Sequence, residues 1–193
     1  MDLVTAPALC LIGYMSGSVL YAPLVCRMLN APPPHLYGSH NPGATNVYRI
    51  AGPGPALLTL CADALKGWLP VTLAQMLETS PTTQAATGLF AITGHILPLF
   101  SRFSGGKGIA TTLGAGLALA AITILCAALI WLLVFRRSQI ASLASITAAV
   151  SAPVLSIWFN PAQLELFVII MLVLLIRHRD NLVRLAQGRE TPV

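Results

Sequence analysis

Hydrophobic positions along the chain gather into six long blocks, separated by short polar connections. Helical runs of this length approach or exceed the thickness of a bilayer's hydrocarbon core, about 30 Å. The pattern therefore predicts an all-α integral membrane protein. The blocks run over residues 3–26, 53–76, 84–100, 107–135, 140–158 and 163–176.

Composition supports this class. Of the 193 residues, 56% are hydrophobic and 9% are charged, and the mean hydropathy is +0.79. In soluble domains, about a quarter of all residues are charged. The blocks leave little chain for anything else, so residues 1–193 are expected to form a single membrane-embedded domain. No Lys or Arg precedes the first block, which is therefore expected to remain as a span and not to be cleaved as a signal peptide.

The fourth block, residues 107–135, would be about 43 Å long as one helix. If it turns back between Gly114 and Ala121, nearly all of the eleven Lys and Arg residues fall on one side of the membrane. The positive-inside rule places that side in the cytoplasm. The expected fold has seven transmembrane helices, two of them short, with the N-terminus outside and the C-terminus cytoplasmic.

The net charge of +5 is explained by these loops, and no aromatic-rich basic surface accompanies it. We therefore expect no nucleic-acid partner. The four cysteines lie in or beside apolar blocks and lack metal-ligand spacing. The sequence predicts no metal and no cofactor.

The polar run from Gly38 to Arg49 stands between the first two blocks. Its glycines permit tight turns, and its Ser, Thr and Asn side chains supply short donors and acceptors. If a helix begins near Thr45, its unpaired backbone N–H groups and Arg49 face the same place, as in phosphate sites. An ordinary helix cap and linker is the competing interpretation.

A second glycine-rich run, Gly105 to Gly108, opens the predicted fourth helix. Exposed backbone N–H groups, the helix N-terminus and Lys107 together favour an anion. The run is not a Walker P-loop, because Gly108 stands where that motif has Ser or Thr. Two anion sites predict two phosphorylated ligands, and lipid-exposed crevices would admit an acyl chain. Acyl transfer is the simplest chemistry.

Polar residues also lie inside the predicted spans. Asp63 and Lys66 share a face of the second span and can neutralise each other there, as a functional pair or as a structural support. His95 lies near the cytoplasmic end of the third span, where a hydrogen-bonded spacer is the commoner role. At the end of the last span, His178 and Asn181 share a face if the helix continues.

Two other classes of protein compete with an acyltransferase. An organophosphate transporter or channel would also need cationic helix ends, but it usually places its site at the midplane between internal repeats, and no repeat is visible here. A membrane scaffold leaves the glycine-rich runs unexplained.

Five motifs, in order along nearly the whole chain, resemble the bacterial acyl-phosphate:glycerol-3-phosphate acyltransferases. They are Gly-Ser-x-Asn-Pro-Gly-Ala-Thr-Asn-Val-x-Arg (38–49), Asp-x-x-Lys-Gly (63–67), Gly-His-Ile-x-Pro (94–98), Gly-Gly-Lys-Gly-x-Ala-Thr (105–111) and Arg-His-x-x-Asn-x-x-Arg-Leu with a later Glu (177–190). The resemblance implies a seven-helix enzyme of the bacterial cytoplasmic (inner) membrane, with its active site facing the cytoplasm. It would move a fatty acyl group from acyl phosphate to the 1-hydroxyl of sn-glycerol 3-phosphate, giving lysophosphatidic acid and phosphate. Acyl-CoA and acyl carrier protein are not expected donors, and the peripheral enzyme that makes acyl phosphate is a candidate partner besides the lipid bilayer.

The resemblance also implies roles for residues. Ser39, His178 and Asn181 are expected to be catalytic. Asp63, Lys66 and Glu190 are expected to support the site. Candidate substrate-binding residues are Gly38, Asn41, Gly43, Ala44, Thr45, Asn46, Arg49, His95, Gly105, Gly106, Lys107 and Gly108.

The chain departs from the family pattern at two places. Family members usually carry Asp-x-Arg where this chain has Pro33-Pro34-His35, and Gly where it has His40. A charge contribution from the first position is therefore absent, and His40 is expected to crowd or re-tune the turn.

Two bases are possible for the attacking hydroxyl. Either His178 accepts its proton, or the departing phosphate of the donor does. An acyl phosphate already has a good leaving group, so the site mainly has to align two anions and offset their repulsion. We favour the phosphate, because no carboxylate is obviously placed in the sequence to orient His178.

Overall fold

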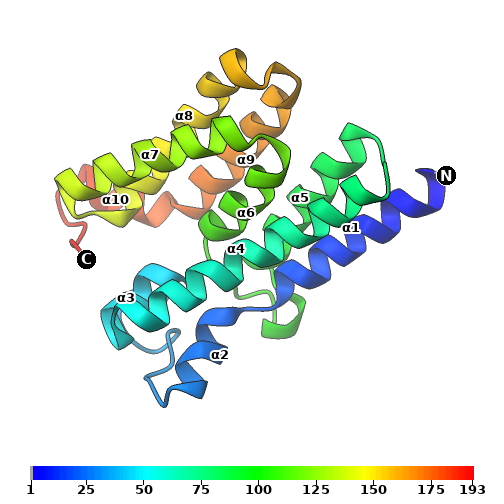
Figure 1. Ribbon diagram of the computed structural model, residues 1–193. Helices are drawn as coiled ribbons and strands as arrows, with labels where there is room; N and C mark the ends of the chain where they lie inside the picture. Colours follow the sequence, from blue (N-terminus) through cyan, green and yellow to red (C-terminus); the bar gives the residue numbers. More distant parts are fainter. Residues whose placement is uncertain (1) are drawn as a thin grey trace. The chain divides into compact units, whose positions relative to one another are not determined.

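The computed structural model describes residues 2–193, and the side chains of Asp2 and Leu3 lie outside the described part. Within these residues all regular secondary structure is helical and there is no strand, as predicted. The chain forms two compact units, Met1–Leu119 and Ala120–Val193 (Figure 1).

The first unit contains six α-helices and one short 3-10 helix, η1. They are α1 (Asp2–Ser18), α2 (Tyr21–Met28), α3 (Ala44–Ala51), α4 (Pro53–Met76), α5 (Pro81–Ile96), η1 (Leu99–Ser101) and α6 (Ile109–Leu119). Helix α4 packs against α1, α3, α5 and α6, so it forms the centre of this unit. Pro53 begins α4, where its missing N–H costs nothing.

The first apolar block is not one continuous helix. Its α-helical hydrogen bonding stops after Ser18 and resumes at Tyr21, because Leu20 adopts an extended conformation. Pro23 lies in the first turn of α2, where proline is tolerated. Residues Val4–Met28 are nevertheless apolar enough to count as one candidate span with a break.

Glycines bring two helix pairs into close backbone contact. A Cβ on Gly17 of α1 would overlap the backbone of Ala91 in α5, and a Cβ on Gly94 would overlap Tyr14 O of α1. Between α4 and α6, a Cβ on Gly114 would overlap Ala64 O. Small residues at these positions let the helix backbones approach closely, as in membrane-embedded helix pairs.

The predicted break in the fourth block is confirmed. Helix α6 ends at Leu119, Ala120 leaves the helical region with φ −156° and ψ 66°, and α7 begins at Ala121. The eleven residues of α6 make a helix of about 16 Å, half the thickness of a hydrocarbon core.

The second unit contains α7 (Ala121–Ser138), α8 (Ala141–Phe159), the 3-10 helix η2 (Pro161–Gln163), α9 (Leu164–Arg177) and α10 (Arg179–Ala186). Helix α8 packs against both α7 and α9. Trp131 Nε1 of α7 donates a hydrogen bond to Ser145 Oγ of α8 at 3.0 Å. Between α9 and α10 the chain bends by 65°, so the last helix does not run straight through His178.

Among the described residues, four segments are long and apolar enough to cross a membrane, or five if α9 and α10 are counted as one bent span. The four are Val4–Met28, Pro53–Met76, Ala121–Ser138 and Ala141–Phe159. Helix α5, with 16 residues, and α6, with 11, are shorter. The all-helical membrane class is therefore confirmed, and the count of seven spans stays a prediction.

Candidate functional site

The run from Gly38 to Arg49 folds as a loop that enters α3. The predicted helix start near Thr45 is confirmed within one residue, because α3 begins at Ala44 with Gly43 as its N-cap. The Gly43 carbonyl accepts hydrogen bonds from the N–H groups of Asn46 (3.0 Å) and Val47 (3.1 Å). Val47 is fully buried in a small core that also contains Ala22 of α2 and Ala56 of α4. This packing fixes the first turn of α3.

The side chain of Asn46 holds the loop that precedes it. Asn46 Oδ1 accepts a hydrogen bond from Ser39 N at 2.8 Å, and Nδ2 donates to Pro34 O at 2.8 Å and to Tyr37 O at 3.0 Å. Ser39 and Arg49, at opposite ends of this segment, are both solvent-exposed. Asn41 and Thr45 were both expected to bind substrate. Asn41 lies in this loop, and Thr45 lies in the first turn of α3.

His40 adopts a left-handed backbone conformation with φ +58°. Glycine reaches this region without steric cost, which explains physically why the family pattern usually has glycine here. His40 Nδ1 lies 3.2 Å from His35 O, and because a carbonyl only accepts, Nδ1 is the donor. The two departures from the family pattern therefore contact each other.

The second glycine-rich run lies directly against His95 of α5. Gly106 N donates to His95 O at 3.1 Å, and a Cβ on Gly106 would overlap the imidazole at Nε2. The run ends at Gly108, which has φ +85° and whose carbonyl accepts the first helical bond of α6 from Thr112 N at 2.8 Å. The prediction that these glycines open a helix is confirmed, and Lys107 stands immediately before its first turn.

Two buried hydroxyls follow on this helix. Thr111 Oγ1 and Thr112 Oγ1 have no hydrogen-bond partner among the described residues. Buried polar groups normally find one, so each leaves an unsatisfied donor in the first turn of α6. The sequence does not identify these two residues as part of the site, because burial of a threonine hydroxyl is not visible from residue type.

Behind the glycine-rich loop lies the predicted ion pair. Lys66 Nζ is 2.7 Å from Asp63 Oδ1, and both side chains are about 1% exposed. Lys66 Nζ also donates to Val19 O at 2.6 Å, at the break between α1 and α2. On its other side, Asp63 Oδ1 lies 3.7 Å from His95 Nδ1. The pair thus joins the break in the first span to the histidine that contacts Gly106.

In the second unit, His178 stands at the bend between α9 and α10. It ends α9 and begins α10, and its side chain is 2% exposed. His178 Nδ1 lies 2.8 Å from Leu174 O, which can only accept. A neutral imidazole with its proton on Nδ1 carries its lone pair on Nε2. The carbonyl of Leu174 therefore orients this ring.

Asn181 is held through Glu190. Glu190 Oε1 accepts hydrogen bonds from Asn181 Nδ2 at 2.5 Å and from Ser142 Oγ of α8 at 2.7 Å, while Oε2 accepts from Arg184 Nε at 2.6 Å. Burial alone would raise the pKa of Glu190, but the hydrogen bonds from Ser142, Arg184 and Asn181 outweigh it and lower the pKa below the ordinary value. Glu190 is thus a structural centre of this unit, consistent with its predicted supporting role.

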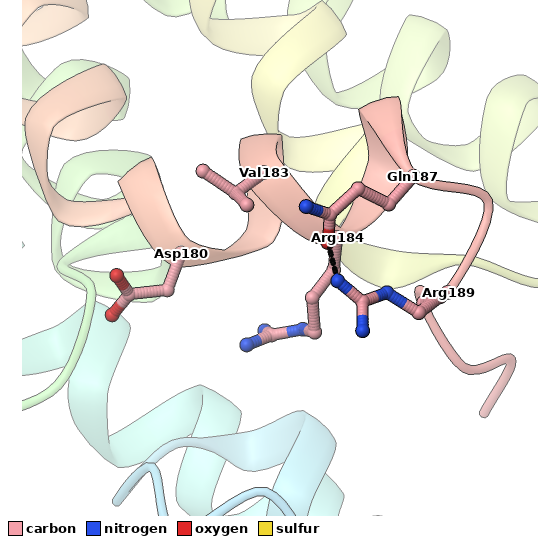
Figure 2. Close-up of a pocket in the computed structure, with 5 residues that line it drawn as sticks. All are labelled: Asp180, Val183, Arg184, Gln187 and Arg189. Carbon is pink, nitrogen blue, oxygen red and sulfur yellow. Dashed lines mark hydrogen bonds between the residues drawn. The ribbon is translucent and has the colours of Figure 1, made fainter.

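An open groove of about 400 Å³ lies along α10 (Figure 2). Arg184 and Arg189 point into it, and Arg189 Nη2 donates a hydrogen bond to Gln187 Oε1. The groove is lined by Asp180, Val183, Arg184, Gln187 and Arg189. His178 and Asn181 are not part of its lining, so the groove does not coincide with the predicted catalytic residues of this unit.

The structure therefore brings the predicted residues together in two sets. The first unit joins Asn46 to the Ser39 loop, and Asp63, Lys66 and His95 to the Gly105–Gly108 loop. The second unit joins Asn181 to Glu190, beside His178. Among the side chains that the structure describes, those of residues 4–193, no three His, Cys, Asp or Glu are arranged to hold a metal ion.

Comparison with known proteins gives the family. A family model described as glycerol-3-phosphate acyltransferase matches residues 7–188, across both units. The chain belongs to this family. A glycerol-3-phosphate acyltransferase of Hahella chejuensis is 52% identical over 179 residues, covering 93% of this chain and 92% of the relative. One of Halorhodospira halophila is 43% identical and covers 96% of this chain and 95% of the relative.

Two solved structures share the fold. The crystal structure of PlsY, an integral membrane glycerol 3-phosphate acyltransferase, in its glycerol 3-phosphate form matches with a TM-score of 0.90 and 34% identity. It covers 98% of this chain and 96% of that one. The lysophosphatidic acid form of the same protein matches with a TM-score of 0.89 and 34% identity.

The lowered pKa of Glu190 predicts a pH-dependent attachment of the C-terminal segment. Because the folded state binds the proton less tightly than the unfolded state, Glu190 stabilises the fold fully above the ordinary pKa of 4.5, and this contribution is lost as the pH falls through the lower folded value. We expect Glu190→Gln to lower the melting temperature at pH 7. The difference from the wild type should shrink as the pH falls below about 4.5.

Melting temperatures in detergent micelles between pH 7 and pH 4 would measure this. Glu165→Gln is the matched control, since Glu165 is exposed in the first turn of α9. Equal melting temperatures of Glu190→Gln and wild type at pH 7, or a difference that grows in acid, would contradict the assignment.

Proposed function

We propose that this protein transfers a fatty acyl group from acyl phosphate to the 1-hydroxyl of sn-glycerol 3-phosphate, giving lysophosphatidic acid and phosphate. The observation that carries the proposal is the match of residues 7–188 to the glycerol-3-phosphate acyltransferase family. The two PlsY structures, described as glycerol 3-phosphate and lysophosphatidic acid forms, support the same acceptor and product.

The first unit supplies the groups that such a reaction needs for its anions. Lys107 and the N-terminal end of α6 provide one positive pole. The N-terminal end of α3, which Gly43 caps, and Arg49 in its last turn provide another. We propose that these two loops bind the phosphate groups of donor and acceptor and offset the repulsion between them.

The chemical step needs little acid–base assistance. The acceptor hydroxyl oxygen bonds to the acyl carbon, the carbon–oxygen bond to the donor phosphate breaks, and the hydroxyl proton goes to a base. With His178 Nδ1 donating to Leu174 O, Nε2 is the basic atom of the neutral ring. A phosphate with a second pKa near 6 is a comparable base, and it is already bonded to the reacting carbon. We favour the leaving phosphate as the base, with His178 and Asn181 positioning the acceptor.

We further propose seven spans in the bacterial cytoplasmic membrane, with the N-terminus outside and the glycine-rich loops facing the cytoplasm. The one-sided distribution of basic residues supports this topology. Within the second unit, Val193 N donates to Gln139 O at 2.9 Å, which places the C-terminal residues beside the α7–α8 turn. That contact supports placing this turn and the C-terminus on the same side of the membrane.

The direct test is an assay of purified protein with glycerol 3-phosphate and each of three donors. Acyl phosphate should give lysophosphatidic acid, whereas acyl-CoA and acyl carrier protein should not. Product with acyl-CoA alone would overturn the donor while keeping the acceptor, and no product with any donor would overturn the proposed function.

Lys107 is expected to be indispensable for rapid turnover. Lys107→Ala should lower kcat/KM by about a hundredfold or more, the order seen when one preorganised electrostatic contact is lost. Lys107→Arg should recover only part of the loss, because a planar fork replaces a compact charge. Arg136→Ala, at the exposed end of α7, is the control for loss of a positive charge. A fully active Lys107→Ala variant would reduce the loop to a linker.

His178→Gln separates the two candidate bases. If the donor phosphate takes the proton, the variant should keep measurable acyl transfer, with part of its loss in the KM for glycerol 3-phosphate. If His178 is the base, kcat should vanish while substrate binding persists. The acidic limb of the pH profile of kcat should survive in an active variant, because the phosphate, not the histidine, then causes it. A variant that binds substrate but is inactive would overturn our preference.

Single cysteines at Ser80, Ser138 and Gln187, in a protein without its four native cysteines, would test the topology. Positions 138 and 187 should label from the cytoplasmic side and position 80 from the other, as measured with an impermeant thiol reagent in sealed vesicles. Labelling of 138 and 187 from opposite sides would contradict the seven-span arrangement.

A further inference from the structure

The amide of Asn46 has its hydrogen-bonding groups committed inside the protein. The side chain is 1% exposed, and its two N–H groups donate to the carbonyls of Pro34 and Tyr37. Its oxygen accepts from Ser39 N. A carboxamide has two donor hydrogens, so neither remains for a ligand. The orientation of the amide is also fixed, because two carbonyls require donors and a backbone N–H requires an acceptor.

The loop is built to receive this amide. Gly38 has φ +66°, and a Cβ at this position would overlap Asn46 Oδ1, with Ile50 Cγ2 also at 3.3 Å. Only glycine combines this backbone conformation with such a close approach. Asn46 itself is fixed through its N–H, which donates to Gly43 O, and through its buried neighbour Val47. The loop is thereby attached to a packed helix turn and not only to its own ends.

We propose that Asn46 is a positioning residue, which holds Ser39 at a fixed place relative to α3 and Arg49 without touching substrate. This inference rests on the proposed function for the roles of Ser39 and Arg49. It replaces the expectation that Asn46 binds substrate with an indirect role. The connection from α2 to α3 runs from Leu29 to Gly43, and holding its residues in one conformation costs backbone entropy. The three hydrogen bonds that the buried Asn46 side chain makes hold the part of this connection that contains Ser39 in a single conformation.

Hydrogen exchange tests the attachment without any substrate. In Asn46→Ala, the peptide that contains Ser39 should exchange at least tenfold faster than in the wild type, because the Ser39 N–H loses its acceptor. Asn46→Asp keeps the volume and the acceptor but replaces the donor to Pro34 O and Tyr37 O by a second oxygen, so it should also accelerate exchange. Asn30→Asp is the matched control, since Asn30 is exposed at the start of the same connection. Wild-type exchange in both Asn46 variants would overturn the proposal.

Kinetics then distinguish positioning from a merely structural effect. Asn46→Ala should lower kcat/KM by about 10- to 100-fold, as expected when a catalytic group moves by about an ångström. If Asn46 acts through Ser39, the double variant Ser39→Ala/Asn46→Ala should lose much less than the product of the two single losses. Single losses that multiply would show that Asn46 acts independently of Ser39 and would overturn the proposal.

A substitute variant covers a failure to fold, and the exchange experiment does not depend on enzyme activity. If Asn46→Asp does not fold, Asn46→Ser takes its place, because it retains one short hydrogen-bonding group and should give an intermediate exchange rate. If the wild type makes no lysophosphatidic acid, the proposed function fails, while the exchange experiment still decides whether Asn46 holds the Ser39 loop.

Discussion

A charged pair inside α4 constrains most of the first unit. Asp63 and Lys66 are almost completely buried, and two charges in an apolar interior are tolerated only when each is paired and hydrogen-bonded. Lys66 meets this requirement by donating to the carbonyl of Val19. Helix α1 has ended at Ser18, so this carbonyl lacks a helical partner. Asp63 faces His95, whose backbone and ring contact Gly106. The ion pair thus connects a helix break to the loop that carries Lys107.

The same unit shows how an irregular loop can exist in a membrane protein. Free backbone groups are costly in lipid, so non-helical segments must be buried in protein or line a cavity. Here Gly106 N is satisfied by His95 O, and Gly108 O by the first turn of α6. Close backbone contact at Gly67 and Gly114 fixes α6 against α4, so the helix start cannot drift from the ion pair. Rigid placement of the positive helix end is what electrostatic catalysis requires.

The sequence predicted the features that arise from local pattern. The bounds of α4 follow from Pro53 and a predominantly apolar run. The break near Ala120 follows from a block too long for one span, together with the side on which the basic residues fall. The extended residue Leu20, the bend at His178 and the three partners of Glu190 were not predicted. Ser142 is distant from Glu190 in sequence, and Lys66, which donates to Val19 O beside Leu20, is distant from the helix break. Asn46 was selected as a candidate by its motif, and its hydrogen-bonding pattern is visible only in the folded structure.

The two departures from the family pattern also make a contact that the sequence alone does not reveal. Residue by residue, His35 and His40 look like two separate losses, one of a charge and one of a glycine. In the folded loop they form one contact, because the left-handed backbone of His40 brings its ring Nδ1 to the carbonyl of His35. That bond partly offsets the strain of a side chain at a position suited to glycine. Asn46 binds the carbonyl of Pro34, one residue earlier, so the altered segment remains attached to α3 by a side chain that the family motif retains. The loop therefore tolerates both changes while the Ser39 backbone stays in place.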